Sequence, residues 1–571
     1  MASKVVVAAV PVATATSGSG GATLESQVTY TGRWAKTRKS TIDLLCFAIF
    51  VGGCIAFFVS GFVIVGKKNF DPSQISFGNI SGLDGFSEDF KQEIQDCQAE
   101  LVGRRLQVSI FELEERFFDV FGRDPYIVAT PMAIVVVIAV IWLGSLIKFA
   151  RFVAWACTII SIVLPGFLGI VLLVEGVDAT TPGLLIAYTI FLAFIAYKTR
   201  AEIDQAAGHM RIAVTILLKK PAIFLAAFVI EVLFLLSMAA AFWFTVSSAL
   251  IFEAKPENFC IPTTVEYVGK LQAFYGFFFF WIMHYFAASR LVVVAMTVSG
   301  YFFEDSKKPG NYAMHALKTT LTSSAPTISV GALITAVTEY IFKKTQERFW
   351  FLDPIGCFLQ CLLILIGSCI QALTRFSLIS HGISGEGFFT SATLAFHTIK
   401  QSGLVDNPNS SGHRAFLAAY INDRVAVFVT ELSSSTFAIV SGLIGWSLAD
   451  KATDQNTLSE LFTLIDSAFL FVVFVFFFLW ITKRPMFGLF GIILGTNWIP
   501  TGIPVFLIPG ICGIFIACLA AIFLDFTAAV VLNAIDTVFL LQAIAKVNNV
   551  VYEGEKGLWA EQMTGEAVAL V

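Results

Sequence analysis

Two aspartates stand in one apolar stretch near the end of the chain. Asp525 and Asp536 both fall within residues 511–542, a run long enough to cross a bilayer. They are eleven residues apart, and at about 100° per residue they return to nearly the same face of a helix. A carboxylate at membrane depth is costly and usually faces a cavity or a partner. These two residues are therefore the first candidates for a functional site.

Three further ionisable residues lie in apolar runs. Glu231 falls within residues 221–251, and His284 and Arg290 fall within residues 271–299. Glu231 and Arg290 have the charges to pair across a helical bundle, although the sequence gives no distance between them. His284 is a candidate for proton coupling, because histidine titrates near physiological pH. The alternative is a histidine that is satisfied within the bundle.

The sequence carries no pattern for the common enzyme chemistries. It has no GxSxG, HExxH or P-loop, and no GxGxxG between a strand and a helix. Its six histidines form no spaced cluster, so we predict no metal site. Asp525 and Asp536 would lie about 16 Å apart along a helix, too far to act on one bond. We predict a protein that is not an enzyme and has no cofactor.

Composition assigns the chain to a membrane. Of its 571 residues, 57% are hydrophobic and 14% are charged, against about 25% charged residues in soluble domains. We predict an all-α, polytopic bundle of transmembrane helices with about ten to twelve spans. No basic patch of the nucleic-acid type is present, so the predicted partners are the lipid bilayer and a small solute, with no nucleic acid.

The chain divides into a tail, a transmembrane domain and a second tail. Residues 1–40 hold an apolar run too short to span, followed by Ser, Gly and Thr, which predicts a disordered cytoplasmic tail and no signal peptide. Residues 41–545 form the predicted transmembrane domain, and residues 546–571 form a C-terminal tail. Basic residues just before the first span favour a cytoplasmic N-terminus.

The largest polar segment between spans is residues 66–127. Acidic residues outnumber basic ones there, and one span separates it from the cytoplasmic start, so we predict an extracytoplasmic loop. Asn79 opens an Asn-Ile-Ser sequon and is a candidate for glycosylation. Cys97 is the one cysteine of this loop, and Cys260 lies in the next loop on the same side. The sequence allows two alternatives here, a Cys97–Cys260 disulfide or two separate thiols.

Two features lie at the predicted cytoplasmic side. Asp43 stands at the mouth of the first span, either as a helix-start acid favoured by the macrodipole or as a functional residue. The connector 198–220 is basic and partly amphipathic, which predicts a segment lying at the membrane interface.

Six stretches resemble the choline transporter-like family, solute carrier family 44 with its fungal relatives. They keep the same order and spacing over about residues 38–545: 38–43 with 69–72, 146–155, 211–220, 331–339, 385–396 and 535–540. The fifth begins Gly-Glu-Gly-Phe-Phe-Thr-Ser-Ala, similar to the family's Gly-x-x-Phe-x-x-Ser-Ala. The sixth, Ile-Asp-Thr-Val-Phe-Leu, is similar to the family's closing Val-Asp-Thr-Leu-Phe-Leu. The chain departs from the pattern at His284, where Asn is expected, and at Arg290, near an expected Gln.

The resemblance implies a carrier that moves choline or a related organic cation across a membrane. A quaternary ammonium has no hydrogen to donate, so aromatic faces hold it by cation–π attraction, about 0.5–2 kcal/mol per ring, beside a carboxylate. The candidate residues are three aromatics and three acids: Trp155, Trp281, Tyr285, Glu231, Asp525 and Asp536. The alternative for each aromatic is a packing or interfacial role, and the alternative for Asp536 is a helix-end or structural hydrogen-bonding role.

The implied mechanism is alternating access without ATP hydrolysis by the chain itself, since no P-loop is present. Glycines and prolines in residues 500–510 interrupt the lead-in to the last helix, as a hinge requires. The sequon favours the plasma membrane, with an organelle membrane as the alternative. Competing functions are a non-transporting scaffold or receptor, a carrier for a different small solute, and a lipid enzyme, which the missing motifs disfavour. The sequence does not determine the oligomeric state.

Overall fold

The computed structural model describes residues 40–67, 125–174, 180–249, 252–253, 263–264, 266–302, 312–348, 354–401, 412–452 and 507–548. The predicted glycosylation site and disulfide lie outside these residues, at Asn79, Cys97 and Cys260. The apolar runs 461–481 and 486–498, which entered the predicted number of spans, also lie outside.

The described part is helical except for one short ladder, in which Phe252–Glu253 (β1) pairs antiparallel with Thr263–Thr264 (β2). The helices are α1 (Thr41–Lys67), α4 (Tyr126–Val174), α5 (Thr180–Lys198), α6 (Arg200–Lys219), α7 (Ala222–Ala249), α8 (Glu266–Phe302), α9 (Tyr312–Leu321), α10 (Ala325–Arg348), α11 (Pro354–Ser384), α12 (Phe388–Gln401), α13 (Gly412–Ala452) and α17 (Leu507–Asn548). Within the described ranges, six helices are long and apolar enough to cross a membrane, or seven if the bent pair α9 and α10 is one span. The prediction of an all-α membrane bundle is confirmed.

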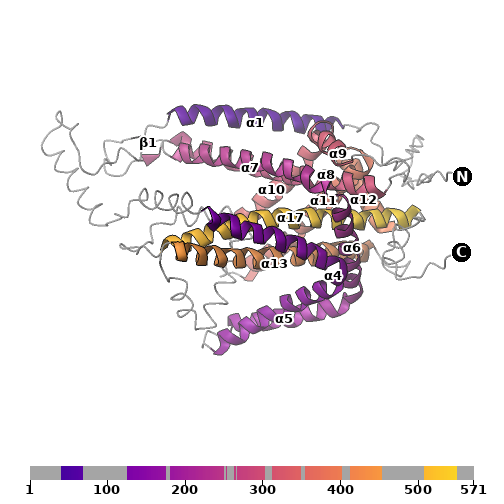
Figure 1. The fold of residues 1–571 in the computed structure, drawn as a ribbon. Helices are drawn as coiled ribbons and strands as arrows, with labels where there is room; N and C mark the ends of the chain where they lie inside the picture. The colour runs from indigo at the N-terminus through magenta and orange to yellow at the C-terminus, as the bar shows by residue number, and fades with distance from the viewer. Residues whose placement is uncertain are drawn as a thin grey trace, which may run out of the picture.

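Helix α4 is two predicted spans joined at a kink. Its 49 residues would extend about 74 Å if straight, more than twice the roughly 30 Å hydrocarbon core. Phe149 has non-helical torsion angles, with φ at −120° and ψ at 19°, and it divides the helix in two. The arms, 126–148 and 150–174, cover two apolar runs of the sequence that are each predicted to span, about 127–146 and 153–174. The second arm lies beside α5 (Figure 1).

Helix α1 packs with one face against α7, α8 and α10 and leaves the other face uncovered. On the packed face, a Cβ added at Gly53 would lie 1.9 Å from the Phe278 ring, and one added at Gly61 would lie 2.3 Å from the Phe244 ring. The two glycines therefore let aromatic rings reach the helix backbone. The opposite face exposes large apolar side chains, including Leu45 and Phe62, which is the surface expected against lipid.

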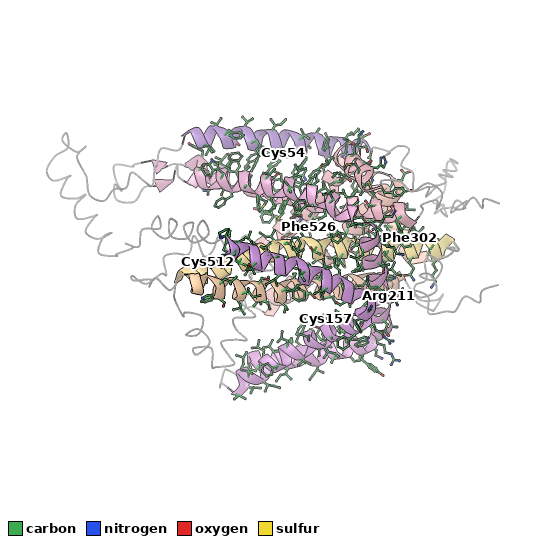
Figure 2. The ribbon with its side chains drawn as sticks, viewed as in Figure 1. Cys54, Cys157, Arg211, Phe302, Cys512 and Phe526 are labelled. Atoms are coloured by element: carbon green, nitrogen blue, oxygen red, sulfur yellow. The ribbon has the colours of Figure 1, made fainter. Side chains whose placement is uncertain are left out.

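Helix α6 lies across the bundle at one end (Figure 1). Ile203, Met210 and Leu217, two turns apart from each other, are buried against the bundle, and His209 hydrogen-bonds Gln542 of α17. Arg211 points outward at this end (Figure 2). The connector that the sequence predicted to lie at the membrane interface forms this helix, and its apolar face packs against α4, α13 and α17.

Helices α13 and α17 approach each other through small residues. A Cβ added at Gly442 would lie 2.7 Å from the Cβ of Ala517, and one added at Gly513 would lie 2.9 Å from the carbonyl oxygen of Gly442. Ala438 faces Ala521 in the same apolar cluster. Small-residue contacts of this kind let helix backbones come close in a membrane, where packing drives association.

We expect Gly513→Ala to destabilise the protein by about 1–3 kcal/mol, because the added methyl group overpacks this contact. Gly144→Ala is the matched control, since a Cβ at Gly144 meets nothing within 4 Å and loss of glycine in a helix stabilises by about 0.5–1 kcal/mol. Thermal unfolding of both variants in detergent measures the difference. A Gly513→Ala protein as stable as wild type would show that the two helices do not approach so closely.

Candidate functional site

An ion pair joins α7 to α8 inside the bundle. Arg290 Nη1 donates to Glu231 Oε2 at 2.5 Å, and the two side chains are 18% and 13% exposed. Glu231 lies nine residues after Ala222, where α7 begins, or about 14 Å along the helix. The pair is therefore at membrane depth, and the pairing expected from charge is confirmed.

Asp525 lies close to this ion pair and is held by a neighbouring helix. Ser434 Oγ of α13 donates to Asp525 Oδ1 at 2.6 Å. The charges of Glu431, Arg290 and Glu231 also act on Asp525. We call these five residues, which come from α7, α8, α13 and α17, the charge cluster. Arg290 pairs with Glu231 there, while Asp525 is bound by the Ser434 hydroxyl. A carboxyl group that is held inside a bundle by a neutral group suits a cationic ligand.

The small residues of α13 and α17 set the position of Asp525. Gly442 meets Ala517 at the close approach. Eight residues before Gly442 on α13 is Ser434, and eight residues after Ala517 on α17 is Asp525. Because the helices are antiparallel, equal steps in opposite directions bring these side chains opposite each other. The hydrogen bond between them thus follows from the register of the small residues.

Asp536 belongs to a different polar contact. Its Oδ2 lies 2.8 Å from Arg375 Nε of α11, and Arg375 Nη2 donates to Asn533 Oδ1 at 3.2 Å. The Asp536 side chain is fully buried, and the helical rise separates it from Asp525 by about 16 Å. The structure therefore brings Asp525 together with Glu231, and not with Asp536, whose role in substrate binding stays a prediction.

Trp281 and Tyr285 form an aromatic trio with Phe50 of α1. The Phe50 ring is stacked on Tyr285 with centroids 4.7 Å apart and lies 5.2 Å from the ring of Trp281. Trp281 Nε1 donates to the carbonyl oxygen of Ser329 in α10 at 3.2 Å. Both predicted aromatics are buried, so neither belongs to an interfacial belt. The trio offers aromatic faces where α1 meets α8.

The aromatic trio and the charge cluster lie on different faces of α8. From Trp281 to Arg290 is nine residues, or about 900° of rotation, which places them on opposite faces. From Tyr285 to Arg290 the difference is about 140°. The predicted rings and acids therefore do not converge on one face in this arrangement; α8 lies between them.

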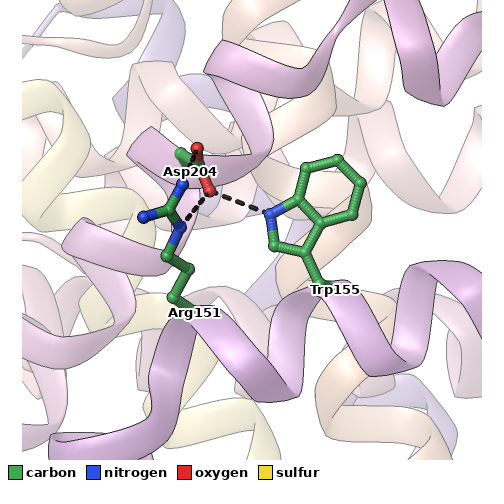
Figure 3. Close-up of polar contacts among 3 residues, drawn as sticks. All are labelled: Arg151, Trp155 and Asp204. Carbon is green, nitrogen blue, oxygen red and sulfur yellow. Dashed lines mark hydrogen bonds and ion pairs between the residues drawn. The ribbon is translucent and has the colours of Figure 1, made fainter.

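Trp155 lies away from both groups, near the kink of α4. Its Nε1 donates to Asp204 Oδ1 of α6 at 2.9 Å, and Arg151 binds both oxygens of the same carboxylate at 2.8 Å (Figure 3). The Arg151 side chain is 76% exposed. Trp155 therefore helps to hold α6 across the end of the bundle, and a direct role in substrate binding stays a prediction.

His284 pairs with a carboxylate of α10. Its Nε2 lies 2.9 Å from Glu339 Oε2, and the Glu339 side chain is 44% exposed. The mostly buried imidazole of His284 is thus in contact with a carboxylate that is partly exposed to solvent. This arrangement fits both alternatives given by the sequence, proton coupling and a satisfied histidine.

The sequence interpretation missed Glu431, Ser434 and Phe50. Glu431 carried a usable signal, because it is an acid within the apolar run 425–448 and the rule that selected Asp525 applies to it equally. Ser434 and Phe50 carried none, since serines are common in these spans and Phe50 is one of 58 phenylalanines.

Comparison with known proteins gives two matches. The model of a family described as plasma-membrane choline transporter matches residues 183–498, which is more than half of the 571 residues. A CTL-like protein of Dictyostelium discoideum is 22% identical over 399 residues, covering 63% of this chain and 69% of that protein.

Proposed function

Because the chain belongs to the plasma-membrane choline transporter family, we propose that it is a carrier for choline or a related small organic cation. The family match and the apolar helices make it a multi-pass membrane protein of transporter type. The observation that carries the choice of a cation is the Asp525 carboxyl group, which lies near the Glu231–Arg290 ion pair and is bound by the neutral hydroxyl of Ser434.

Asp525 is the proposed counter-charge for the substrate. Glu231 is already paired with Arg290, whereas Asp525 is bound by a neutral hydroxyl, that of Ser434. A cation that approaches Asp525 need only compete with a hydrogen bond, and not with a guanidinium. This difference makes Asp525 the carboxylate that a trimethylammonium group reaches at the smallest cost.

Phe50, Trp281 and Tyr285 are the proposed aromatic surface. Cation–π attraction requires the cation within about 6 Å of a ring face, and the stacked faces of Phe50 and Tyr285 now cover each other. Exposing them requires α1 to move from α8. We therefore assign the trio to a different step of the transport cycle from Asp525, with alternating access between the two faces of α8.

Transport is proposed to need no ATP hydrolysis by the chain, and the plasma membrane is the proposed location. The test is uptake of radiolabelled choline into liposomes that contain the purified full-length protein. We expect saturable uptake that excess unlabelled choline suppresses, with empty liposomes as the control. A folded, monodisperse protein that gives no uptake above empty liposomes would overturn choline as the substrate.

A non-transporting scaffold is the second candidate, and one observation favours it. Glu231 and Asp536 are each paired with an arginine, as charged residues are when they serve packing alone. The liposome assay separates the two functions, because a scaffold gives no saturable flux for choline, ethanolamine or other small cations.

A further inference from the structure

Asp43 fastens the start of α1 to two other helices. Its side chain is fully buried, and its Oδ2 accepts hydrogen bonds from Thr327 Oγ1 at 2.8 Å and from the backbone N–H of Phe388 at 3.2 Å. Thr327 lies in the first turn of α10, and Phe388 begins α12. We call this set of contacts the latch; it lies at the same end of the bundle as α6 (Figure 1).

The chain reversal before α12 aims its first N–H at Asp43. Helix α11 ends at Ser384 and is followed by Gly385, whose φ of 76° is the left-handed conformation that glycine adopts without strain. The Gly385 N–H closes the helix by donating to the carbonyl oxygen of His381 at 2.8 Å. A carboxylate at the start of α12 is also favoured by the helix dipole. Asp43 thus both links α1 to α10 and caps the N-terminus of α12.

Three polar atoms around the latch lack a hydrogen-bond partner among the residues that the structure describes. They are Asp43 Oδ1, Ser324 Oγ and His381 Nε2, and each of the three residues is fully buried. Ser324 immediately precedes α10, one turn before Thr327. An orphaned polar atom in such a position is destabilising, so a cluster of three is a place to look for a function beyond packing.

The protonation state of His381 follows from its other nitrogen. His381 Nδ1 lies 2.5 Å from the carbonyl oxygen of Glu386. A carbonyl only accepts, so Nδ1 carries the hydrogen, and Nε2 of the neutral ring presents a lone pair. The charge of Asp43 acts on this ring. Nε2 of His381 and Oδ1 of Asp43 are therefore two buried acceptors with no donor among the described residues. A proton bound to Nε2 would supply one.

The surroundings of His381 are otherwise neutral. Helix α8 places Ala295 and Met296 beside Gly382, and Ser391 of α12 donates its hydroxyl to the Glu386 carbonyl. Among the described residues, Asp43 of α1 is the charged side chain that acts on the ring, and Glu386 contributes its backbone carbonyl. An alkali cation prefers a shell of oxygen ligands, so the imidazole in this set selects a proton instead.

We propose that His381 is a proton-binding site that releases the latch between α1, α10 and α12. A charged imidazolium cannot stay fully buried without a counter-ion. It must either draw the Asp43 carboxylate away from Thr327 and Phe388, or move to water together with the end of α11. Both responses free the start of α1.

Release of α1 would couple acidity to access at this end of the bundle. Helix α1 carries Phe50, so its movement exposes the aromatic trio. This consequence rests on the proposed function, whereas proton-driven release of the latch does not. The experiment therefore uses a structural readout that needs no substrate.

Hydrogen–deuterium exchange of the full-length protein in detergent tests the latch at about pH 7.5 and about pH 4.5, because burial lowers the pKa of His381 below its ordinary value of roughly 6.5. After correction for the intrinsic effect of pH, we expect amides in residues 41–50 to lose protection by about tenfold at the lower pH. His315→Gln is the matched control, because His315 is exposed on α9 at the same end. It should respond as wild type does.

His381→Gln should abolish the acid response while the protein stays folded. Thr327→Val removes one donor to Asp43 and keeps the side-chain shape, so it should lower the protection of residues 41–50 at both pH values. Equal protection of the wild-type segment at the two pH values would overturn the proposal. An acid response that persists in His381→Gln and matches His315→Gln would overturn it as well.

Discussion

Asp525→Asn is expected to lower the kcat/KM for choline uptake by roughly a hundredfold. A carboxylate and a quaternary ammonium about 5 Å apart, at an effective dielectric constant of about 20, attract by about 3 kcal/mol. At about 1.4 kcal/mol per tenfold change, this is two powers of ten. Asn keeps an oxygen that accepts from Ser434 and has nearly the same volume, so the variant loses the charge and keeps the helix contact.

Two variants separate charge from structure at this position. Ser434→Ala removes the hydrogen bond to Asp525 and leaves its carboxylate, so uptake should fall far less than in Asp525→Asn. Glu202→Gln makes the same kind of change on α6, outside the charge cluster, and should leave uptake unchanged. Wild-type uptake by Asp525→Asn would move the substrate carboxylate elsewhere, with Glu231 the next to test.

Glu231→Gln is expected to destabilise the protein by about 3–5 kcal/mol, because it leaves the Arg290 guanidinium inside the bundle without its counter-ion. Arg290→Gln should cost a similar amount for the opposite reason. The double replacement removes both charges and should recover most of the stability, as buried ion pairs replaced by neutral groups do. Thermal unfolding in detergent gives the three values, and additive losses in the double variant would show that the pair is not coupled.

Arg290 also has an expected effect on transport. Its positive charge acts on Asp525 and opposes a cation there, so Arg290→Gln should lower the KM for choline in whatever fraction of the protein stays folded. Glu231→Gln should raise it. A KM that moves in the same direction in both variants would indicate loss of structure instead of electrostatics.

Much of the architecture could be predicted from the sequence because membrane spans are local. The apolar runs that became α1, α7 and α8 need only length and composition to be recognised, since every backbone polar group inside a bilayer must be bonded within its own helix. The kink in α4 was also local: Lys148 and Arg151 interrupt the apolar run, and the structure bends at Phe149 between them.

For a related reason, only the charged residues of the candidate site could be predicted from the sequence. A charge in an apolar run is conspicuous by itself, so Glu231, Arg290 and Asp525 could be selected without a structure. Their partners could not, because Ser434 and Phe50 are ordinary residues for such helices. The amphipathic pattern of α6 predicted a buried face, but the pattern is the same whether that face meets lipid or other helices.

The sequence by itself determined that the protein is a helical membrane bundle of this family, and which charges had to be sheltered inside it. Only the tertiary structure decided that Asp525 accepts from Ser434 near Glu231 and Arg290, while Asp536 pairs with Arg375. It also decided that α8 separates the aromatic trio from the charges. The physical reason is that hydropathy acts along one helix. The partner of a buried charge is set by the rotation and register of neighbouring helices, and here those depend on small residues such as Gly442 and Gly513.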